Sequence, residues 1–329
     1  MRTFIAAPRR LLLSMLVSVL ALAAMPTGAS SQSYPNRPIR VIVPIGAGGL
    51  TDIVARTVAE RLEKRLGQPI VIENKPGADT VLGTTFVARA DPDGYTLLMA
   101  DSAAYSIAPQ LHAVEYDTRR DFTLIGRMYD GAGIIVSAHP SVPFRTVPEL
   151  VAYAKANPGK LDLATGSAVL QITGEMFKQE AGVDIKHVPY RGSVQAVSDT
   201  LAGHVGMVVT GTASVAPHIQ TGKLVPIAVA SPARSKAVPT APTFIESGYP
   251  GVIMANWFGL LGPKGLPQPV VDRINAALSE IIGDPALKDL ADQSDLNLRL
   301  TTGEPLRQEL ADEYRRIGSA IEKAAMKVK

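Results

Sequence analysis

The chain has 329 residues, no cysteine, and 33 basic against 30 acidic side chains, which gives a formal net charge of +3 at pH 7. The lack of cysteine excludes thiol catalysis, thiolate metal sites and a lipidated N-terminal cysteine, and it suits an oxidising compartment. After the first residues there is no lysine- and arginine-rich cluster of the kind that binds a phosphate backbone, so nucleic acid is not predicted as a partner.

The N-terminus has the order of a secretory signal. Arg2, Arg9 and Arg10 precede an uncharged run at 11–24, and small residues follow as far as Ser31. This run is shorter than the ~20 apolar residues that a membrane-spanning helix needs. We therefore predict that residues 1–31 are a signal peptide that is cleaved on export to the periplasm. The sequence does not decide between the general and the twin-arginine export route. Because the three arginines are the only charged residues of this segment, the mature chain has a net charge near zero.

The first part of the mature chain alternates β-rich runs with helical patterns. The expected elements are a strand at 39–43, a turn at 46–49, a helix at 54–66, a strand at 71–72, a helix at 81–90 and a strand at 95–99. The helix at 54–66 repeats apolar residues at every fourth position, which buries one stripe of its surface. This β-α-β-α-β order predicts a parallel sheet with right-handed crossovers.

A second series of the same kind follows, so we predict two α/β lobes. Its expected strands are 134–136, 161–164, 186–188, 205–209, 225–229 and 257–261, and its expected helices are 174–180, 193–202, 269–282 and 304–325. The two last helices have no strands of their own and are expected to pack on the first lobe. The predicted division is 32–131 with 258–329 for lobe I, and 132–257 for lobe II. Two short chain crossings then form a hinge beside a ligand cleft.

The sequence offers few residues for catalysis. Its five histidines show no metal-ligand spacing, and no G-x-S-x-G elbow occurs. The run Gly46–Gly49 matches neither a dinucleotide fingerprint nor a P-loop. Lying between a strand and a helix, it suits the binding of an anion through backbone N–H groups, although a plain tight turn explains it equally well. We predict no metal, no cofactor and no enzymatic activity.

Five stretches resemble the signatures of one family, in that family's order. They are Ile42–Arg56, Ile72–Ala78, Asp91–Leu97, His187–Gly192 and Trp257–Gly265. Together they are similar to the substrate-binding proteins of tripartite tricarboxylate transporters, the Bug or TctC family, over essentially the whole chain. The resemblance implies a fold of the periplasmic-binding-protein type and a monomer that closes on a small organic acid. It also implies a transient partner, the permease subunits in the membrane.

The resemblance further implies which residues bind the ligand. From lobe I they are Ala47, Gly48, Gly49, Asp52, Ser102 and Tyr105, and from lobe II they are Gly166, Ser167, Ala168, Tyr190, Gly192, Ser193 and Asp199. We expect Asp52 to support the first loop more than to touch the ligand, although an acidic residue in a first helical turn is favoured without any ligand. For Tyr105, packing in the core is as good an explanation as a hydroxyl contact with the ligand. Asp199 either receives an N–H or O–H group of the ligand or is a solvated helix residue.

Two departures from the family pattern bear on the ligand. Relatives commonly carry two glycines where this chain has Asp79–Thr80, and a polar loop ending in histidine where it has Ala168–Gln171. A dicarboxylate, an amino acid and an acid with a larger apolar body therefore all stay open as ligands. Two other functions also stay open, a binding protein that presents its ligand to a receptor kinase and a periplasmic α/β hydrolase.

Overall fold

The computed structural model describes residues 34–254, 256–323 and 326. The predicted signal peptide and its cleavage position lie outside these residues. The chain divides into Met1–Asn36 and Arg37–Lys329, and every element named below belongs to the second unit. Among the helices that the structure describes, none combines the length and the hydropathy of a membrane span.

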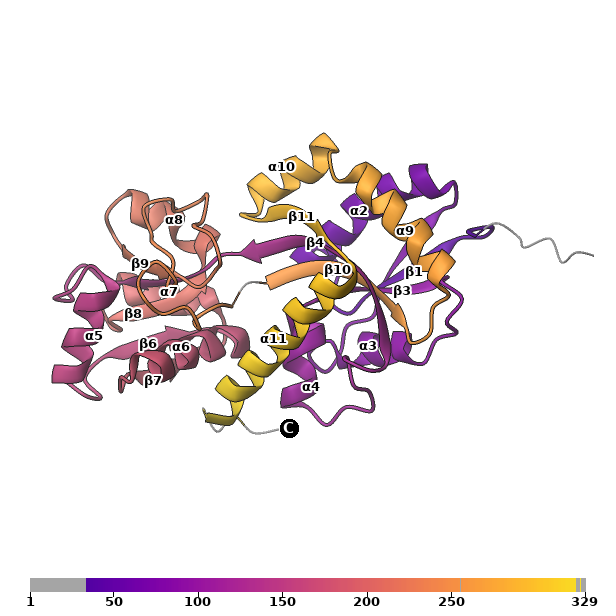
Figure 1. Ribbon diagram of the computed structural model, residues 1–329. Coiled ribbons are helices and arrows are strands. Elements are labelled where there is room, and N and C mark those ends of the chain that lie inside the picture. The colour runs from indigo at the N-terminus through magenta and orange to yellow at the C-terminus, as the bar shows by residue number, and fades with distance from the viewer. Residues whose placement is uncertain (1–33, 255, 324–325, 327–329) are drawn as a thin grey trace, which may run out of the picture. The chain divides into compact units, whose positions relative to one another are not determined.

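Six strands form the first sheet, in the order β11-β4-β10-β3-β1-β2 (Figure 1). Their bounds are β1 Ile39–Val43, β2 Ile70–Asn74, β3 Thr96–Asp101, β4 Phe122–Ala132, β10 Asn256–Pro263 and β11 Asn297–Thr301. β1 pairs in parallel with β2 and β3, as predicted. β10, however, is antiparallel to both β3 and β4, and β11 is antiparallel to β4. The parallel arrangement predicted for the first three strands is therefore confirmed, and the sheet as a whole is mixed because β10 inserts between β3 and β4 from the opposite direction.

Five strands form the second sheet, in the order β7-β6-β8-β5-β9. Their bounds are β5 Ile134–Ala138, β6 Asp162–Thr165, β7 Lys186–Pro189, β8 Met207–Gly211 and β9 Val225–Val229. β6 is parallel to β7 and β8, whereas β5 is antiparallel to β8 and β9. Both sheets are thus mixed. The predicted residue limits of the two lobes stay a prediction.

Helices separate most of the strands. Their bounds are α2 Leu50–Leu66, α3 Val81–Ala88, a π-helical turn η1 Ala103–Ile107, α4 Ala108–Leu111, α5 Val147–Ala156, α6 Ala168–Ala181, α7 Ser193–Leu201, α8 Thr212–Gln220, α9 Gln268–Ile281, α10 Pro285–Gln293 and α11 Gly303–Lys323. α2, α6 and α7 each follow closely on the end of a strand, namely β1, β6 and β7. Their N-termini therefore lie at carboxyl ends of strands, where α/β proteins commonly bind ligands.

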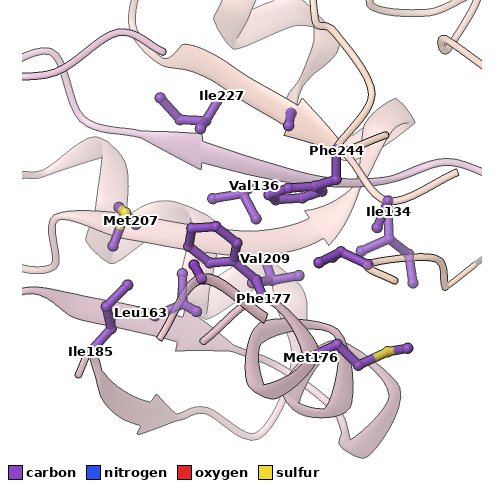
Figure 2. Close-up of a cluster of buried hydrophobic side chains, with 14 of the residues drawn as sticks. Ile134, Val136, Leu163, Met176, Phe177, Ile185, Met207, Val209, Ile227 and Phe244 are labelled. Carbon is purple, nitrogen blue, oxygen red and sulfur yellow. The ribbon is translucent and has the colours of Figure 1, made fainter. Parts of the chain in front are cut away.

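The second sheet packs its core against α6. Figure 2 shows Val136, Leu163 and Val209 of the strands facing Phe177 of the helix, with Phe244 closing the cluster. The rings of Phe177 and Phe244 have centroids 5.1 Å apart, and both side chains are buried. Burying a side chain of this size contributes about 1.5–3 kcal/mol to folding. The scaffold beneath the loops of this sheet is therefore a closely packed apolar layer.

The last helix, α11, packs on elements of both sheets. Leu306 and Leu310, in its first half, belong to the core cluster that contains Trp257 of β10. Ile317 and Ile321, in its second half, belong to the cluster under the second sheet. That second cluster also contains Ile107 of η1 and Leu111 of α4, so the helix packs on elements beside the first sheet along its length, as expected, and on the core of the second sheet as well.

Candidate functional site

The first candidate loop, residues 44–49, joins β1 to α2. Gly48 has a φ of +85°, a left-handed conformation that glycine adopts without strain. A Cβ atom on Gly49 would lie 2.6 Å from Cδ1 of Ile45, so a larger residue has to displace that side chain. Residues 46–48 are exposed, and α2 begins directly after Gly49. The loop therefore offers backbone atoms with little side-chain bulk at the N-terminus of a helix.

Asp52, in the first turn of α2, holds this loop in place. Its carboxylate accepts hydrogen bonds from the amide of Gly48 (2.9 Å), Nε of Arg56 (3.0 Å) and Nδ2 of Asn74 (2.9 Å). The same nitrogen of Asn74 also donates to the carbonyl of Ile45 at 3.1 Å. Burial raises the pKa of Asp52, but the hydrogen bonds outweigh it and keep the pKa below its ordinary value.

These contacts separate the roles predicted for the first loop. Asp52 supports the loop, as expected. The amide of Gly48 donates to Asp52, which gives Gly48 a structural role, and its predicted contact with a ligand stays a prediction. Among the described residues, the amides of Ala47 and Gly49 have no hydrogen-bond acceptor, and their role as anion donors stays a prediction.

A buried carboxyl group ties the second candidate segment, residues 100–105, to the first turn of α2. Asp101, the last residue of β3, accepts hydrogen bonds from Oγ1 of Thr51 (2.8 Å) and from the amide of Ala104 (2.9 Å). Burial raises the pKa of this carboxyl group. Ser102 is 2% exposed, and its amide donates to Oδ1 of Asn256 at 3.2 Å. Sequence reasoning missed Asp101 and Asn256, although both adjoin signature stretches or candidate site residues.

Tyr105 is a core residue. Its side chain is 3% exposed, and its ring stands edge-on to that of Trp257, with centroids 5.9 Å apart. Burial, together with the carboxylate of Glu313, raises the pKa of Tyr105 to about 12. Of the two roles predicted for Tyr105, these contacts support core packing, and the predicted hydroxyl contact with a ligand is corrected accordingly.

The two candidate loops of the second sheet touch through their backbones. A Cβ atom on Gly166 would lie 2.3 Å from the amide nitrogen of Ser193, so glycine permits this close approach. Ser167 is the N-cap of α6, and Gly192 is the N-cap of α7. The hydroxyl of Ser167 makes no capping hydrogen bond, and Gly192 has no side chain that could make one. The structure thus brings together Gly166, Ser167, Gly192 and Ser193, as predicted, at two helix N-termini.

Asp199 lies behind Tyr190. Its Oδ2 accepts a hydrogen bond from the Tyr190 hydroxyl at 2.8 Å, and its side chain is half-buried. Burial and this carboxylate raise the pKa of Tyr190. The interaction is neither of the two predicted for Asp199, a ligand contact or a solvated surface residue. The contact allows Asp199 to position the tyrosine ring, and the predicted ligand contact of Asp199 stays a prediction.

Two adjoining cavities lie next to these loops. The first, which we call the Tyr190 cavity, has a volume of about 410 Å³ and is lined by Asp79, Leu111, His112, Thr165, Ser167, Ala168, Gln171, His187, Pro189, Tyr190 and Met326. The second, the Thr80 cavity, has a volume of about 500 Å³ and is lined by Pro44, Ile45, Pro76, Gly77, Asp79, Thr80, Ala103, Ile107, Ala108, Leu111, His112, Ser167, Ala168 and Val169. Ser167 and Ala168 of the predicted site line both, so the two cavities share walls.

The charge of these cavities comes from few side chains. His187 lines the Tyr190 cavity, and its Nε2 lies 2.6 Å from Oγ1 of Thr165. Burial lowers the pKa of His187, which favours the neutral ring. Asp79 and His112, which both cavities share, form a pair with a distance of 2.9 Å. Within the described ranges, no group of three or more histidine or acidic side chains is arranged to hold a metal ion.

Comparison with known proteins agrees with this architecture. The model of the TctC family, the tripartite tricarboxylate transporter family receptor, matches residues 54–326. The UPF0065 protein in the gbd 5' region of Cupriavidus necator is 33% identical over 312 residues, which are 94% of each chain.

Two solved structures extend the comparison. A TctC solute-binding protein from Polaromonas is 28% identical, with 88% of this chain and 100% of that chain covered and a TM-score of 0.79. The MatC protein of Rhodopseudomonas palustris with bound malate is also 28% identical, with 88% and 100% covered and a TM-score of 0.65. The predicted fold class and the prediction of a binding protein in place of an enzyme are confirmed. This chain belongs to the TctC family of solute-binding receptors.

Proposed function

We propose that this chain is the exported receptor of a tripartite tricarboxylate-type transporter and captures a small organic acid as its carboxylate. One observation carries the proposal. The Thr80 cavity is lined by Ile45 of the first loop, by Ala103 at the start of η1 and by Ser167, the N-cap of α6. Three segments that each lead into or begin a helix thus meet at one cavity of a size that suits a small ligand.

The chemistry of these loops favours an anion. The N-termini of α2 and α6 carry a partial positive charge and backbone N–H groups that no helical carbonyl satisfies. The amides of Ala47 and Gly49, which have no acceptor among the described residues, stand at the first of these helices, beside the Thr80 cavity wall formed by Pro44 and Ile45 but not among its lining residues. A carboxylate placed there receives hydrogen bonds without a buried lysine or arginine. The malate bound by the similar MatC protein supports the same class of ligand.

The proposed action includes closure. β4 leads directly into β5, and the segment after β9 returns to β10, so the chain passes between the two sheets twice. We propose that residues 32–131 with 258–329 form one lobe and 132–257 the other, and that the lobes close on the acid as a monomer. Small-angle scattering should record a smaller radius of gyration at saturation, and an unchanged radius would contradict closure.

Binding is tested with the mature chain, residues 32–329, unfolded and refolded to remove any ligand carried through purification. Malate, succinate, benzoate and 4-hydroxybenzoate are titrated by calorimetry, each beside its neutral amide. We expect at least one acid to bind with one-to-one stoichiometry and to be recovered unchanged, while its amide binds at least 10-fold more weakly. If no acid binds, or if acids and amides bind equally, the proposal is wrong.

Delivery to a permease needs a cellular test. Cells that lack the gene for this chain should lose uptake of the acid identified by calorimetry, and the gene should restore it. Cells that keep the receptor but lack the permease genes should show the same loss. Normal uptake in cells without the permease genes would instead show that this receptor does not deliver its acid to a tripartite transporter.

A further inference from the structure

The Thr80 cavity has a largely apolar wall. Its apolar lining residues come from the first loop, the segment before α3, η1 with α4, and the start of α6; they are Pro44, Ile45, Pro76, Ile107, Leu111 and Val169. Such a wall offers a small, fully charged diacid nothing to bind along its length. It suits the apolar body of a larger acid, because every carbon atom removed from water makes binding more favourable.

Three polar side chains interrupt this wall at one place. Asp79 and His112 form a pair with Oδ2 and Nε2 2.9 Å apart, and Thr80 follows in the chain. The His112 side chain is 17% exposed, whereas that of Asp79 is 83% exposed and can turn toward a ligand. Thr80 is 6% exposed, and its Oγ1 has no hydrogen-bond partner within the described part of the chain. An unsatisfied buried hydroxyl gains by meeting a polar group of a ligand.

The backbone at this place is strained. Ala78, Asp79 and Thr80 have φ values of 44°, 50° and 81°, which place three consecutive side-chain-bearing residues in the left-handed region. Glycine adopts this region freely, and other residues do so only when the surrounding structure holds them there. Glycine would suit the backbone at these positions better. The presence of side chains there therefore indicates that the side chains themselves have a role.

Resting on the proposed function, we propose that the Thr80 cavity is a specificity subsite for a hydroxylated aromatic monocarboxylate. The ring lies along the apolar wall, and its hydroxyl group donates to the carboxylate of Asp79, which His112 orients. The hydroxyl of Thr80 completes the polar end of the subsite. A second carboxylate on the ligand is disfavoured, because it meets the negative charge of Asp79.

The test compares 4-hydroxybenzoate with benzoate, which differ only in the hydroxyl group, and uses malate as the small diacid. Calorimetry is carried out on the wild type and on Asp79→Gly, which removes the carboxylate and suits the left-handed backbone. Asp79→Asn serves as the conservative variant. The matched control is Asp93→Asn, which also removes a partly exposed carboxylate with a side-chain partner, here Arg37, outside both cavities.

The wild type should bind 4-hydroxybenzoate more tightly than benzoate and malate. Asp79→Gly should weaken 4-hydroxybenzoate by about 10- to 100-fold, the range for one hydrogen bond to a charged group, and leave benzoate unchanged. The affinity of Asp79→Asn for 4-hydroxybenzoate should lie between those of the wild type and Asp79→Gly, and the affinity of Asp93→Asn should match that of the wild type. The unfolding temperature of Asp79→Gly should not drop.

Other outcomes overturn the inference and separate it from the proposed function. Tight binding of malate with no binding of either aromatic acid removes the subsite and keeps the receptor for organic acids. Equal loss of both aromatic acids in Asp79→Gly also removes it, because the hydroxyl group then has no part in the effect. Failure of every acid contradicts the proposed function itself.

Discussion

The two halves of the candidate site are fixed by different forces. The first loop is held by side chains, since the carboxylate of Asp52 ties the loop to Arg56 and Asn74. The loops of the second sheet are held by backbone contact, because Gly166 lies directly against Ser193. The first half should therefore respond to a change of charge, and the second to a change of volume as small as one carbon atom.

The largest effect is expected from Gly166→Ala. The new Cβ atom would lie 2.3 Å from the Ser193 nitrogen and 2.4 Å from the Gly192 carbonyl carbon, and both are backbone atoms that cannot rotate away. Overpacking of this kind lowers the free energy of unfolding by about 2–3 kcal/mol. Binding of any acid should weaken at the same time, because α6 and α7 move apart. Thermal unfolding and calorimetry measure the two effects.

The matched control is Gly192→Ala, in the facing loop. A Cβ atom there has nothing within 4 Å, and Gly192 has an extended backbone with a φ of 175°. This variant should keep the stability of the wild type. If both alanine variants are equally stable, the close contact does not hold these loops together.

A change of charge in the first half should have a smaller effect. Asp52→Asn keeps the shape of the side chain but turns one acceptor oxygen into a donor group, which faces the donors of Asn74 and Arg56. We expect a loss of about 1–2 kcal/mol of unfolding free energy, the usual range for such hydrogen bonds. Glu60→Gln, an exposed carboxylate on the same helix, should be neutral. A neutral Asp52→Asn would mean that the loop does not depend on this carboxylate.

The pH dependence sharpens the comparison. Because the pKa of Asp52 in the folded chain lies below its ordinary value of 3.8, the carboxylate stabilises the fold above about pH 4. That contribution is lost as the pH falls through the folded pKa. Denaturant unfolding between pH 3 and pH 6 should show a smaller gain of stability with rising pH for Asp52→Asn than for the wild type. If stability changes equally with pH in Asp52→Asn and in the wild type, other carboxylates cause the loss of stability in acid.

The sequence predicts those parts of the fold whose apolar pattern is local. Strands such as β1 and β9 are short β-rich runs, and α11 shows a long apolar stripe, so their positions agree with prediction. β4 was missed because Gly126, Arg127 and Asp130 interrupt its pattern, and in the fold the two charged residues pair with each other. α5 was missed although Thr146 and Glu149 form a capping box, a signal that the sequence does contain.

The candidate site also has parts that the sequence predicts and parts that it does not. The glycine loops could be found because their spacing is continuous in the sequence. The contacts that hold them could not, because they join distant residues: Thr51 bonds Asp101, and Ser102 bonds Asn256. No local pattern determines which strand ends lie side by side when β10 inserts between β3 and β4. The position of Asp199 on its helix likewise did not reveal that its partner would be Tyr190.

The smallest predicted effect concerns that last pair and decides what Asp199 does. Tyr190→Phe removes the hydroxyl that donates to Asp199 and leaves the ring in the wall of the cavity. Because Asp199 is half-buried and can take a water molecule instead, stability should fall by only about 0.5–1 kcal/mol. If Asp199 acts through the tyrosine, Asp199→Ala should change ligand affinity as little as Tyr190→Phe does, and the double variant should add nothing further. An Asp199→Ala variant that binds its acid 10-fold more weakly than Tyr190→Phe would show instead that the carboxylate meets the ligand itself.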